Sequence, residues 1–145
     1  MLRPEAPRAS TRPAPPMTPA LDQAFAVDRL YALRSAVAAH AADLGAGRLA
    51  DEVVIVAHEL ASNAVRHGGG RGRLWLWREA LDLHCRVADA GPGLAEPDRA
   101  GLRRTPAALP GGRGLFIVRR LVARLDIHTD PTGTTVTAVI PLDRG

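Results

Sequence analysis

The alternation of apolar and polar positions predicts where this chain forms strands. Residues 72–80 read GRLWLWREA, in which the two leucines point to one side of a strand while Trp75 and Trp77 point to the other. Residues 81–89 follow directly and predict the partner strand of a hairpin. Further strands are predicted at 20–27, 126–130 and 134–142, the last two joined at the turn Pro131-Thr132-Gly133.

A helical spacing of apolar residues predicts three helices. The first covers 28–45, where Asp28 is the expected N-cap residue and Gly45 ends the helix. The second covers 48–68 and is closed by the glycine at its last position. The third covers 114–125.

The order of these elements predicts the fold class. It runs strand, helix, helix, hairpin, loop, helix and hairpin, which indicates an α+β two-layer sandwich. We expect a mixed, mainly antiparallel sheet with the helices on one face. Residues 20–145 would form this single domain, and the Pro-, Ala- and Arg-rich residues 1–19 a disordered tail. The long irregular stretch 91–112 is expected to be functional, because structureless loops of that length are uncommon in compact domains.

Composition narrows the function classes. All 19 basic residues are Arg, so neither a phosphate-loop lysine nor a Schiff-base lysine is available. The net charge is +4, but the arginines are scattered and aromatic residues for base stacking are few, so we expect no direct contact with nucleic acid. Cys85 is the single cysteine, no secretory signal is recognisable, and no apolar run approaches the ~20 residues of a membrane span. The expectation is a soluble, cytoplasmic protein without a membrane partner.

The stretch HELASNAVRHGGG, residues 58–70, carries the most distinctive chemistry. Glu59, Asn63 and His67 stand at four-residue steps and therefore share one face of the predicted helix. Such a face is often simply solvated. However, Asn63 is the only asparagine of the chain and asparagine is a poor helix former, while an amide oxygen beside a carboxylate suits a hard cation. A zinc-protease helix is excluded, because Ser62 stands where its second histidine is needed.

Three glycine-containing motifs follow along the chain. Asp89 stands at a strand end and is followed by Gly91 and Gly93, an arrangement that lets a flat ligand reach the backbone but that also occurs in simple turns. Glycines and Arg113 lead directly into the third helix, as in sites where backbone N–H groups and the helix dipole bind an anion. The third motif, residues 133–135, is explained equally well by a turn alone.

In this order and spacing, the four motifs resemble the ATP-binding domain shared by gyrase, heat-shock chaperones, histidine kinases and mismatch-repair ATPases, the Bergerat fold. Residues 58–70 resemble its N-box, residues 89–93 its first glycine box and residues 111–115 its second. Residues 133–135 resemble its closing threonine motif. The resemblance covers roughly residues 20–142, which is nearly the whole chain.

Within that superfamily the chain is most similar to the small bacterial serine/threonine kinases that act as anti-sigma factors. No separate helix for dimerisation and histidine phosphorylation is recognisable, and Glu59 precedes Asn63 by four residues. The resemblance implies ATP and Mg²⁺ as cofactors, an anti-sigma-factor antagonist as substrate and a sigma factor as second partner. It also implies a homodimer, for which Trp75 and Trp77 offer a surface if their side of the sheet lacks helices. The alternative is a module that holds ATP and sequesters a partner without phosphate transfer.

The resemblance also assigns roles to individual residues. Asn63 would hold Mg²⁺, Glu59 would be the general base, and His67 would either contact phosphate or cap its helix. Asp89 would accept the adenine amino group with Thr135 nearby. The residues assigned to the nucleotide are Asn63, His67, Asp89, Gly91, Gly93, Gly111, Gly112, Arg113, Gly114, Leu115, Thr134 and Thr135, with Glu59 and Arg113 as the catalytic residues.

Overall fold

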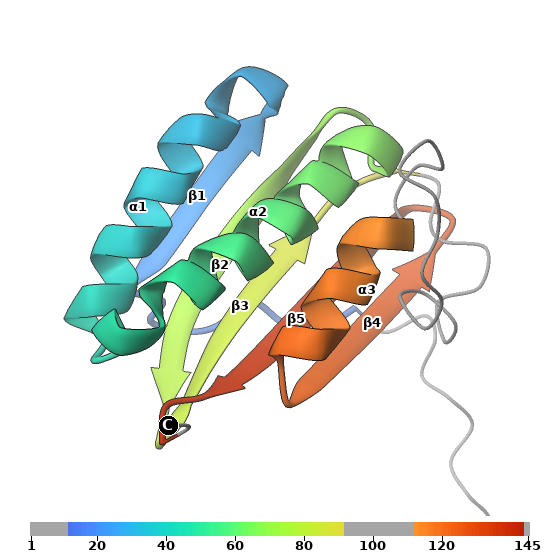
Figure 1. The fold of residues 1–145 in the computed structure, drawn as a ribbon. Coiled ribbons are helices and arrows are strands. Elements are labelled where there is room, and N and C mark those ends of the chain that lie inside the picture. Colours follow the sequence, from blue (N-terminus) through green and yellow to red (C-terminus); the bar gives the residue numbers. More distant parts are fainter. Residues whose placement is uncertain (1–11, 92–111, 144–145) are drawn as a thin grey trace, which may run out of the picture.

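The computed structural model describes residues 12–91 and 112–143, and it has two layers. Three helices lie on one face of a five-stranded sheet with the order β1-β2-β3-β5-β4 (Figure 1). The predicted α+β sandwich is confirmed, and all four strand pairings are antiparallel, whereas the sequence predicted some parallel pairing. The strands are β1 (Leu21–Ala26), β2 (Arg71–Glu79), β3 (Asp82–Ala88), β4 (Arg124–Asp130) and β5 (Gly133–Pro141).

The helices follow the predicted order with shifted ends. They are α1 (Leu30–Asp43), α2 (Ala50–His67) and α3 (Gly112–Leu121), with single 3-10 turns η1 (Val27–Arg29) and η2 (Gly47–Leu49) before the first two. Asp28 lies within η1, so Arg29 and not Asp28 occupies the N-cap position of α1. The third helix ends four residues earlier than predicted. Arg124 and Leu125 instead pair with β5, because long-range strand pairing outweighs their local helical spacing.

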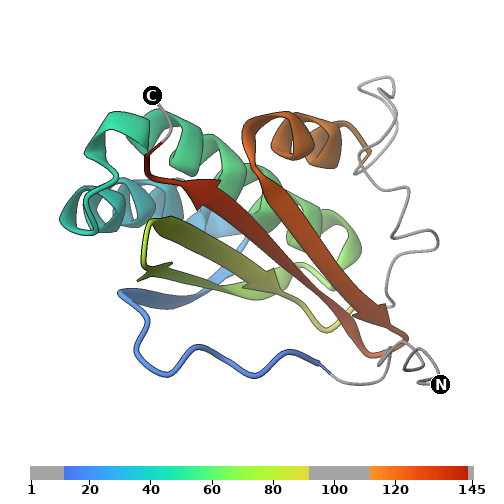
Figure 2. The ribbon, with the colours of Figure 1, turned by 90° about the horizontal axis from the view of Figure 1, so that it is seen from below.

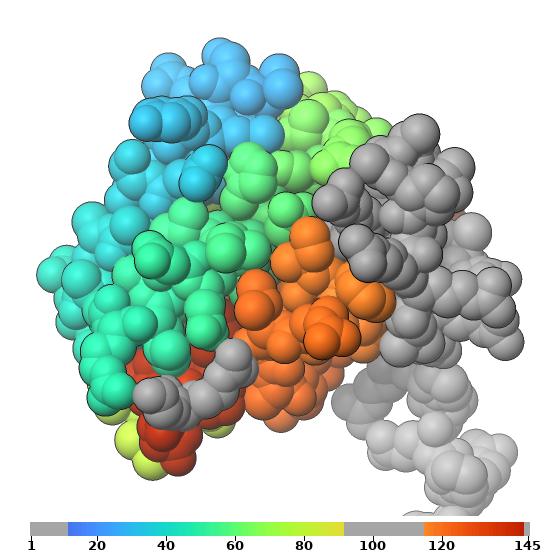
Figure 3. Space-filling view, viewed as in Figure 1, coloured from blue at the N-terminus to red at the C-terminus, as the bar shows by residue number. Residues whose placement is uncertain are grey.

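The hydrophobic core lies between the sheet and the helices. Helix α2 supplies its central stripe, and neighbouring strands supply side chains from alternate positions. In the space-filling view, the helices form one continuous layer over this core (Figure 3). None of the helices in the described ranges is long and apolar enough to cross a membrane. The fully buried core side chains of the strands include Leu74, Leu76, Leu83, Cys85, Ala138 and Ile140.

The opposite face of the sheet has no helix over it in the described part of the chain. Residues 12–20 cross this face instead, without regular secondary structure, before the chain enters β1 (Figure 2). Arg86 of β3 donates a hydrogen bond to the carbonyl oxygen of Ala14 at 2.7 Å. The described part of the predicted tail is therefore irregular, but it contacts the domain.

Candidate functional site

The end of α2, the end of β3 and the start of β5 meet in one small pocket. Two loops bring them together: residues 89–91 follow β3, and the turn 131–132 precedes β5. Asn63 and His67 come from α2, Asp89 from the strand end and Thr134 from β5. The remaining walls are apolar and belong to the core: Leu60, Ala64, Val87 and Val136. Four of the residues predicted for nucleotide binding therefore lie together.

Asp89 is held in a fixed orientation. Its backbone N–H donates to the carbonyl of Thr134 at 2.9 Å, which continues the pairing of β3 with β5 by one residue. Its Oδ1 accepts the backbone N–H of Gly91 at 2.9 Å and that of Thr134 at 3.3 Å. Two donors on Oδ1 leave Oδ2 as the oxygen available to a ligand. Burial raises the pKa of the Asp89 carboxyl, and the N–H groups of Gly91 and Thr134 offset part of that rise.

Three glycines allow the backbone to pack tightly around Asp89. A methyl group on Gly68 would lie 2.2 Å from Cγ of Asp89, and one on Gly133 would lie 2.1 Å from its backbone oxygen. A methyl group on Gly91 would lie 2.4 Å from Cα of Gly68. Distances this short are not tolerated between atoms that are not bonded. The sequence signalled Gly68 as a helix end within the N-box stretch and Gly133 as a turn within the closing threonine motif. Their contact with Asp89 is visible only in the folded chain.

The polar face of α2 is brought only partly into the pocket. Asn63 is 8% exposed and lines it. His67 also lines it, and its Nε2 is buried without a hydrogen-bond partner in the described structure. Glu59, one turn earlier, is half-buried and is not among the residues that line the pocket. A buried imidazole nitrogen without a partner is costly unless a ligand satisfies it, so His67 fits a contact to a bound polar group.

The two threonines of the closing motif point to opposite faces of the sheet. Thr134 lines the pocket and its hydroxyl lies 2.9 Å from that of Thr129. Thr135 instead lines a cleft on the face without helices. The expectation that Thr135 lies near the adenine contact of Asp89 is therefore corrected, because side chains alternate along a strand and Thr134 occupies the position beside Asp89.

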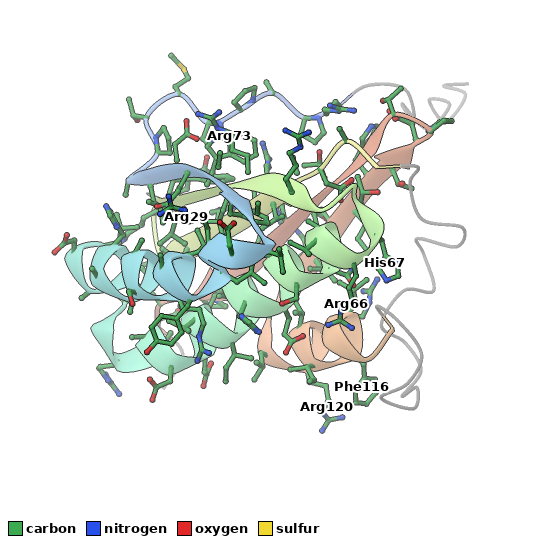
Figure 4. The ribbon with its side chains drawn as sticks, turned by 90° about the horizontal axis from the view of Figure 1, so that it is seen from above. Arg29, Arg66, His67, Arg73, Phe116 and Arg120 are labelled. Carbon is green, nitrogen blue, oxygen red and sulfur yellow. The ribbon has the colours of Figure 1, made fainter. Side chains whose placement is uncertain are left out.

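The predicted phosphate-binding residues lie partly outside the described residues. Gly93 and Gly111 fall outside them, and of Gly112, Arg113 and Gly114 only the backbone is described, as the first turn of α3. Leu115 is 2% exposed and belongs to the core, so its side chain packs rather than binds. The start of α3 lies at the same end of the helical layer as His67 and Arg66 (Figure 4). This placement brings a helix N-terminus close to the end of α2.

Comparisons with known proteins establish the fold and the family of the chain. No curated protein is significantly similar to the chain in sequence. The histidine kinase domain of a blue-light activated histidine kinase, Erythrobacter litoralis EL346, is similar in structure with a TM-score of 0.55 at 21% identity. That similarity covers 78% of this chain and 65% of the other, so the chain spans less than two thirds of that structure.

A second solved structure, the Acinetobacter baumannii histidine kinase AdeS, is similar with a TM-score of 0.52 at 17% identity. That similarity covers 86% of this chain and 68% of the AdeS chain. At such identities the two structures establish a shared fold. The family model for the histidine kinase-like ATPase domain matches residues 24–140, which include the whole pocket. The chain therefore belongs to the family of histidine kinase-like ATPase domains.

Proposed function

We propose that the protein is an ATP- and Mg²⁺-dependent serine/threonine kinase of the anti-sigma-factor type. The observation that carries this proposal is the constellation at the end of α2. Asn63 and Asp89 line one pocket, and Glu59 stands one helical turn before Asn63. Family membership supports ATP as the nucleotide. The carboxylate of Glu59 adds a group that a protein needs for proton transfer and not for nucleotide binding.

Asp89 would recognise the adenine ring. Its Oδ1 is already occupied by two N–H groups, so Oδ2 accepts the amino group of the base. The tight packing of Gly68, Gly91 and Gly133 keeps that oxygen in place while leaving no side chain between it and the ring. Thr134 stands beside it and can hold a bridging water.

Asn63 would provide the protein ligand to Mg²⁺. Among the described residues there is no cluster of three or more His, Cys, Asp or Glu side chains that could hold a metal by itself. Mg²⁺ does not require such a cluster, because it is commonly bound through one or two protein oxygens together with substrate phosphates and water. The Asn63 amide fits this role, and the metal would neutralise phosphate charge during transfer.

Glu59 would take the proton from the attacking serine or threonine hydroxyl. Arg113, in the first turn of α3, would stabilise the charge that develops on the transferred phosphate. The substrate would be a small anti-sigma-factor antagonist domain, and a sigma factor would be the second partner. We also propose that the working form is a homodimer.

A second candidate is an ATP-holding module that sequesters its partner without phosphate transfer. One observation favours it: Glu59 is not among the described residues that line the pocket. The two candidates differ in what Glu59 must do. A general base is essential for transfer, whereas a module that only binds ATP does not need one.

The test separates binding from chemistry with two neighbouring variants. Glu59→Gln keeps the size of the side chain and removes its basicity, so ATP affinity should stay within a few-fold of wild type while phosphate transfer falls by about 10²–10⁴-fold. Asn63→Ala should lose both, because the metal ligand is removed. Calorimetry gives the affinity, and labelled phosphate on antagonist domains from the same genome gives the transfer.

The outcomes discriminate between the two functions. Transfer at the wild-type rate by Glu59→Gln would exclude this residue as the base. A wild-type protein that binds ATP but phosphorylates none of the antagonist domains would favour the sequestering module.

A further inference from the structure

The face of the sheet without helices carries a cleft of ≈ 340 Å³ that the nucleotide chemistry does not use. It lies on the opposite side of the sheet from the pocket around Asp89. Its lining residues include Trp77, His84, Arg86, His128, Thr135 and Thr137, together with the charged side chains of Glu79, Arg124 and Asp126. Most of these are partly or fully polar, yet several are buried, which is unusual for a surface that only faces water.

An aromatic and cationic stack forms the floor of this cleft. The rings of Trp77 and His84 stack at 4.9 Å with an interplanar angle of 16°. The Arg86 guanidinium lies 5.0 Å from the centre of the Trp77 ring, and its Nε donates to Oγ1 of Thr137 at 2.8 Å. These contacts fix the planes of three side chains. The result is a rigid platform that offers flat apolar surface and N–H donors side by side.

One polar atom in the cleft has no partner. Thr135 lines the cleft and is 3% exposed. Its Oγ1 is buried and makes no hydrogen bond in the described structure. Buried hydroxyls are normally satisfied. The described N-terminal segment does not satisfy this hydroxyl, which therefore marks the part of the cleft that the segment leaves open.

The N-terminal segment forms part of the wall of this cleft. Pro13 is among the lining residues, and Nη1 of Arg86 donates a hydrogen bond to the carbonyl oxygen of Ala14 at 2.7 Å. Arg12 donates to the hydroxyl of Thr132 at 2.9 Å and lies 3.9 Å from the Asp130 carboxylate. The contacts therefore follow the segment from the turn between β4 and β5 to the middle of β3.

The sequence of this segment suits the platform. Residues 12–16 read RPAPP, so Pro13 and Pro16 are separated by two residues and an arginine precedes them. Proline fixes its own φ angle and favours an extended conformation in the residue before it, so the run is extended before it binds. Such segments lose little entropy on docking against aromatic-lined grooves, and their carbonyl oxygens are free to accept hydrogen bonds.

We propose that the face of the sheet without helices is a docking groove for an extended proline-rich segment, and that residues 12–16 of the same chain are its occupant. In this position the segment covers Trp77 and keeps the face from other partners. The groove lies on the other face of the sheet from the nucleotide pocket, and the interaction does not depend on phosphate transfer.

The two tryptophans make the proposal directly testable, because Trp75 and Trp77 are the only ones in the chain and both lie on this face. Deletion of residues 1–16 leaves the chain starting at Met17 and retains the bond from the N–H of Ala20 to the carbonyl of Leu76. A tethered segment acts at about millimolar effective concentration, so residues 12–16 should lie on the groove most of the time in the full-length chain. Their removal should therefore raise the acrylamide quenching constant of the two tryptophans about two-fold or more.

A synthetic peptide of residues 12–16 should then bind in trans, because the truncated protein retains residues 17–20. Added to the truncated protein at up to about millimolar concentration, it should restore the shielding in a saturable way. It should bind the full-length protein more weakly, since the tethered segment competes. The peptide with Pro13→Ala and Pro16→Ala is the negative control.

A full-length variant guards against a truncation that fails to fold. Pro13→Ala, Pro15→Ala and Pro16→Ala together leave the groove intact and should also increase tryptophan accessibility. Pro19→Ala, outside the run, is the matched control and should not. Circular dichroism checks the fold of each variant.

Two results would overturn the proposal. One is a folded truncated protein that has the oligomeric state of the wild type and whose tryptophans are quenched no faster. The other is a truncated protein that forms a larger oligomer than the wild type by light scattering and stays in that state, with shielded tryptophans, when the peptide is added. Dissociation of this larger oligomer by the peptide would instead support the groove, since the segment and a second copy would compete for it.

Discussion

The two faces of the sheet are made by the same strands and have opposite chemistry. On the helix side, Leu76 pairs with Cys85, and both are fully buried. On the other side, one position along in each strand, Trp77 pairs with His84 and stacks on it. Burial lowers the pKa of His84, so its neutral form is favoured on this second face. One face is therefore stabilised by apolar packing, and the other by stacking and hydrogen bonds that need a covering segment.

The nucleotide pocket and the proposed groove therefore lie back to back on the two faces of the sheet. Thr134 and Thr135 are neighbours in sequence, yet the first lines the pocket and the second lines the groove. Apart from Asp89→Asn, each of the following variants therefore has a partner one residue away that should behave differently.

The largest effect is expected in the core. Leu76→Ala removes a side chain with 0% exposure and should lower the free energy of unfolding by about 2–5 kcal/mol. Trp75→Ala, on the other face and half-buried, should cost less, about 1–2 kcal/mol. Denaturant unfolding measures both. A larger loss for Trp75→Ala would mean that the face without helices contributes more to stability than the core.

Adjacent glycines separate a steric clash from backbone strain. Gly68→Ala places a methyl group against the Asp89 side chain and should cost about 1–3 kcal/mol of stability together with a clear loss of ATP affinity. Gly69 has a φ of +87° and nothing within 4 Å of an added methyl group, so Gly69→Ala should cost about 1–2 kcal/mol through strain alone. ATP affinity by calorimetry should be retained only in the second variant.

Asp89→Asn should weaken ATP binding and improve stability at neutral pH. The two N–H groups on Oδ1 force the new amide to present its NH₂ group to the ligand, so affinity should fall by about 1–3 kcal/mol. The pKa of Asp89 is raised above its usual 3.8, so its stabilising protonated form is lost as pH rises through the raised value. The gain of the variant in thermal unfolding should therefore be present at pH 7 and vanish below about pH 3.8. A gain that grows towards acid pH would contradict the assigned shift.

The smallest effects should come from the two threonines. Thr134→Val removes the hydroxyl contact with Thr129 and should cost about 0.5–1.5 kcal/mol of stability and weaken ATP binding. Thr135→Val removes a buried hydroxyl without a partner and should leave both stability and ATP affinity unchanged or slightly improved. Equal loss of ATP affinity in both variants would place the nucleotide differently from the pocket around Asp89.

Much of the fold followed from local patterns, because side-chain period depends on the backbone alone. The alternation in 72–80 predicted β2 to within one residue at each end, and the helical spacing around Asn63 predicted α2. The fold class followed from the order of elements, and the resemblance of the four motifs to a known ATP-binding domain assigned Asn63, His67, Asp89 and Thr134 to one site, where they line one pocket.

The sequence by itself thus determined the elements, their order and the candidate chemistry. Only the tertiary structure decided which face each residue serves: that Thr134 and not Thr135 meets Asp89, that Gly68 must lack a side chain, and that residues 12–16 lie across the sheet. The physical reason is the range of the interactions. Periodicity and turn preferences act over a few residues, whereas the contact from Gly68 to Asp89 and the bond from Arg86 to Ala14 join positions far apart in the chain. Such contacts exist only once the sheet has fixed its register.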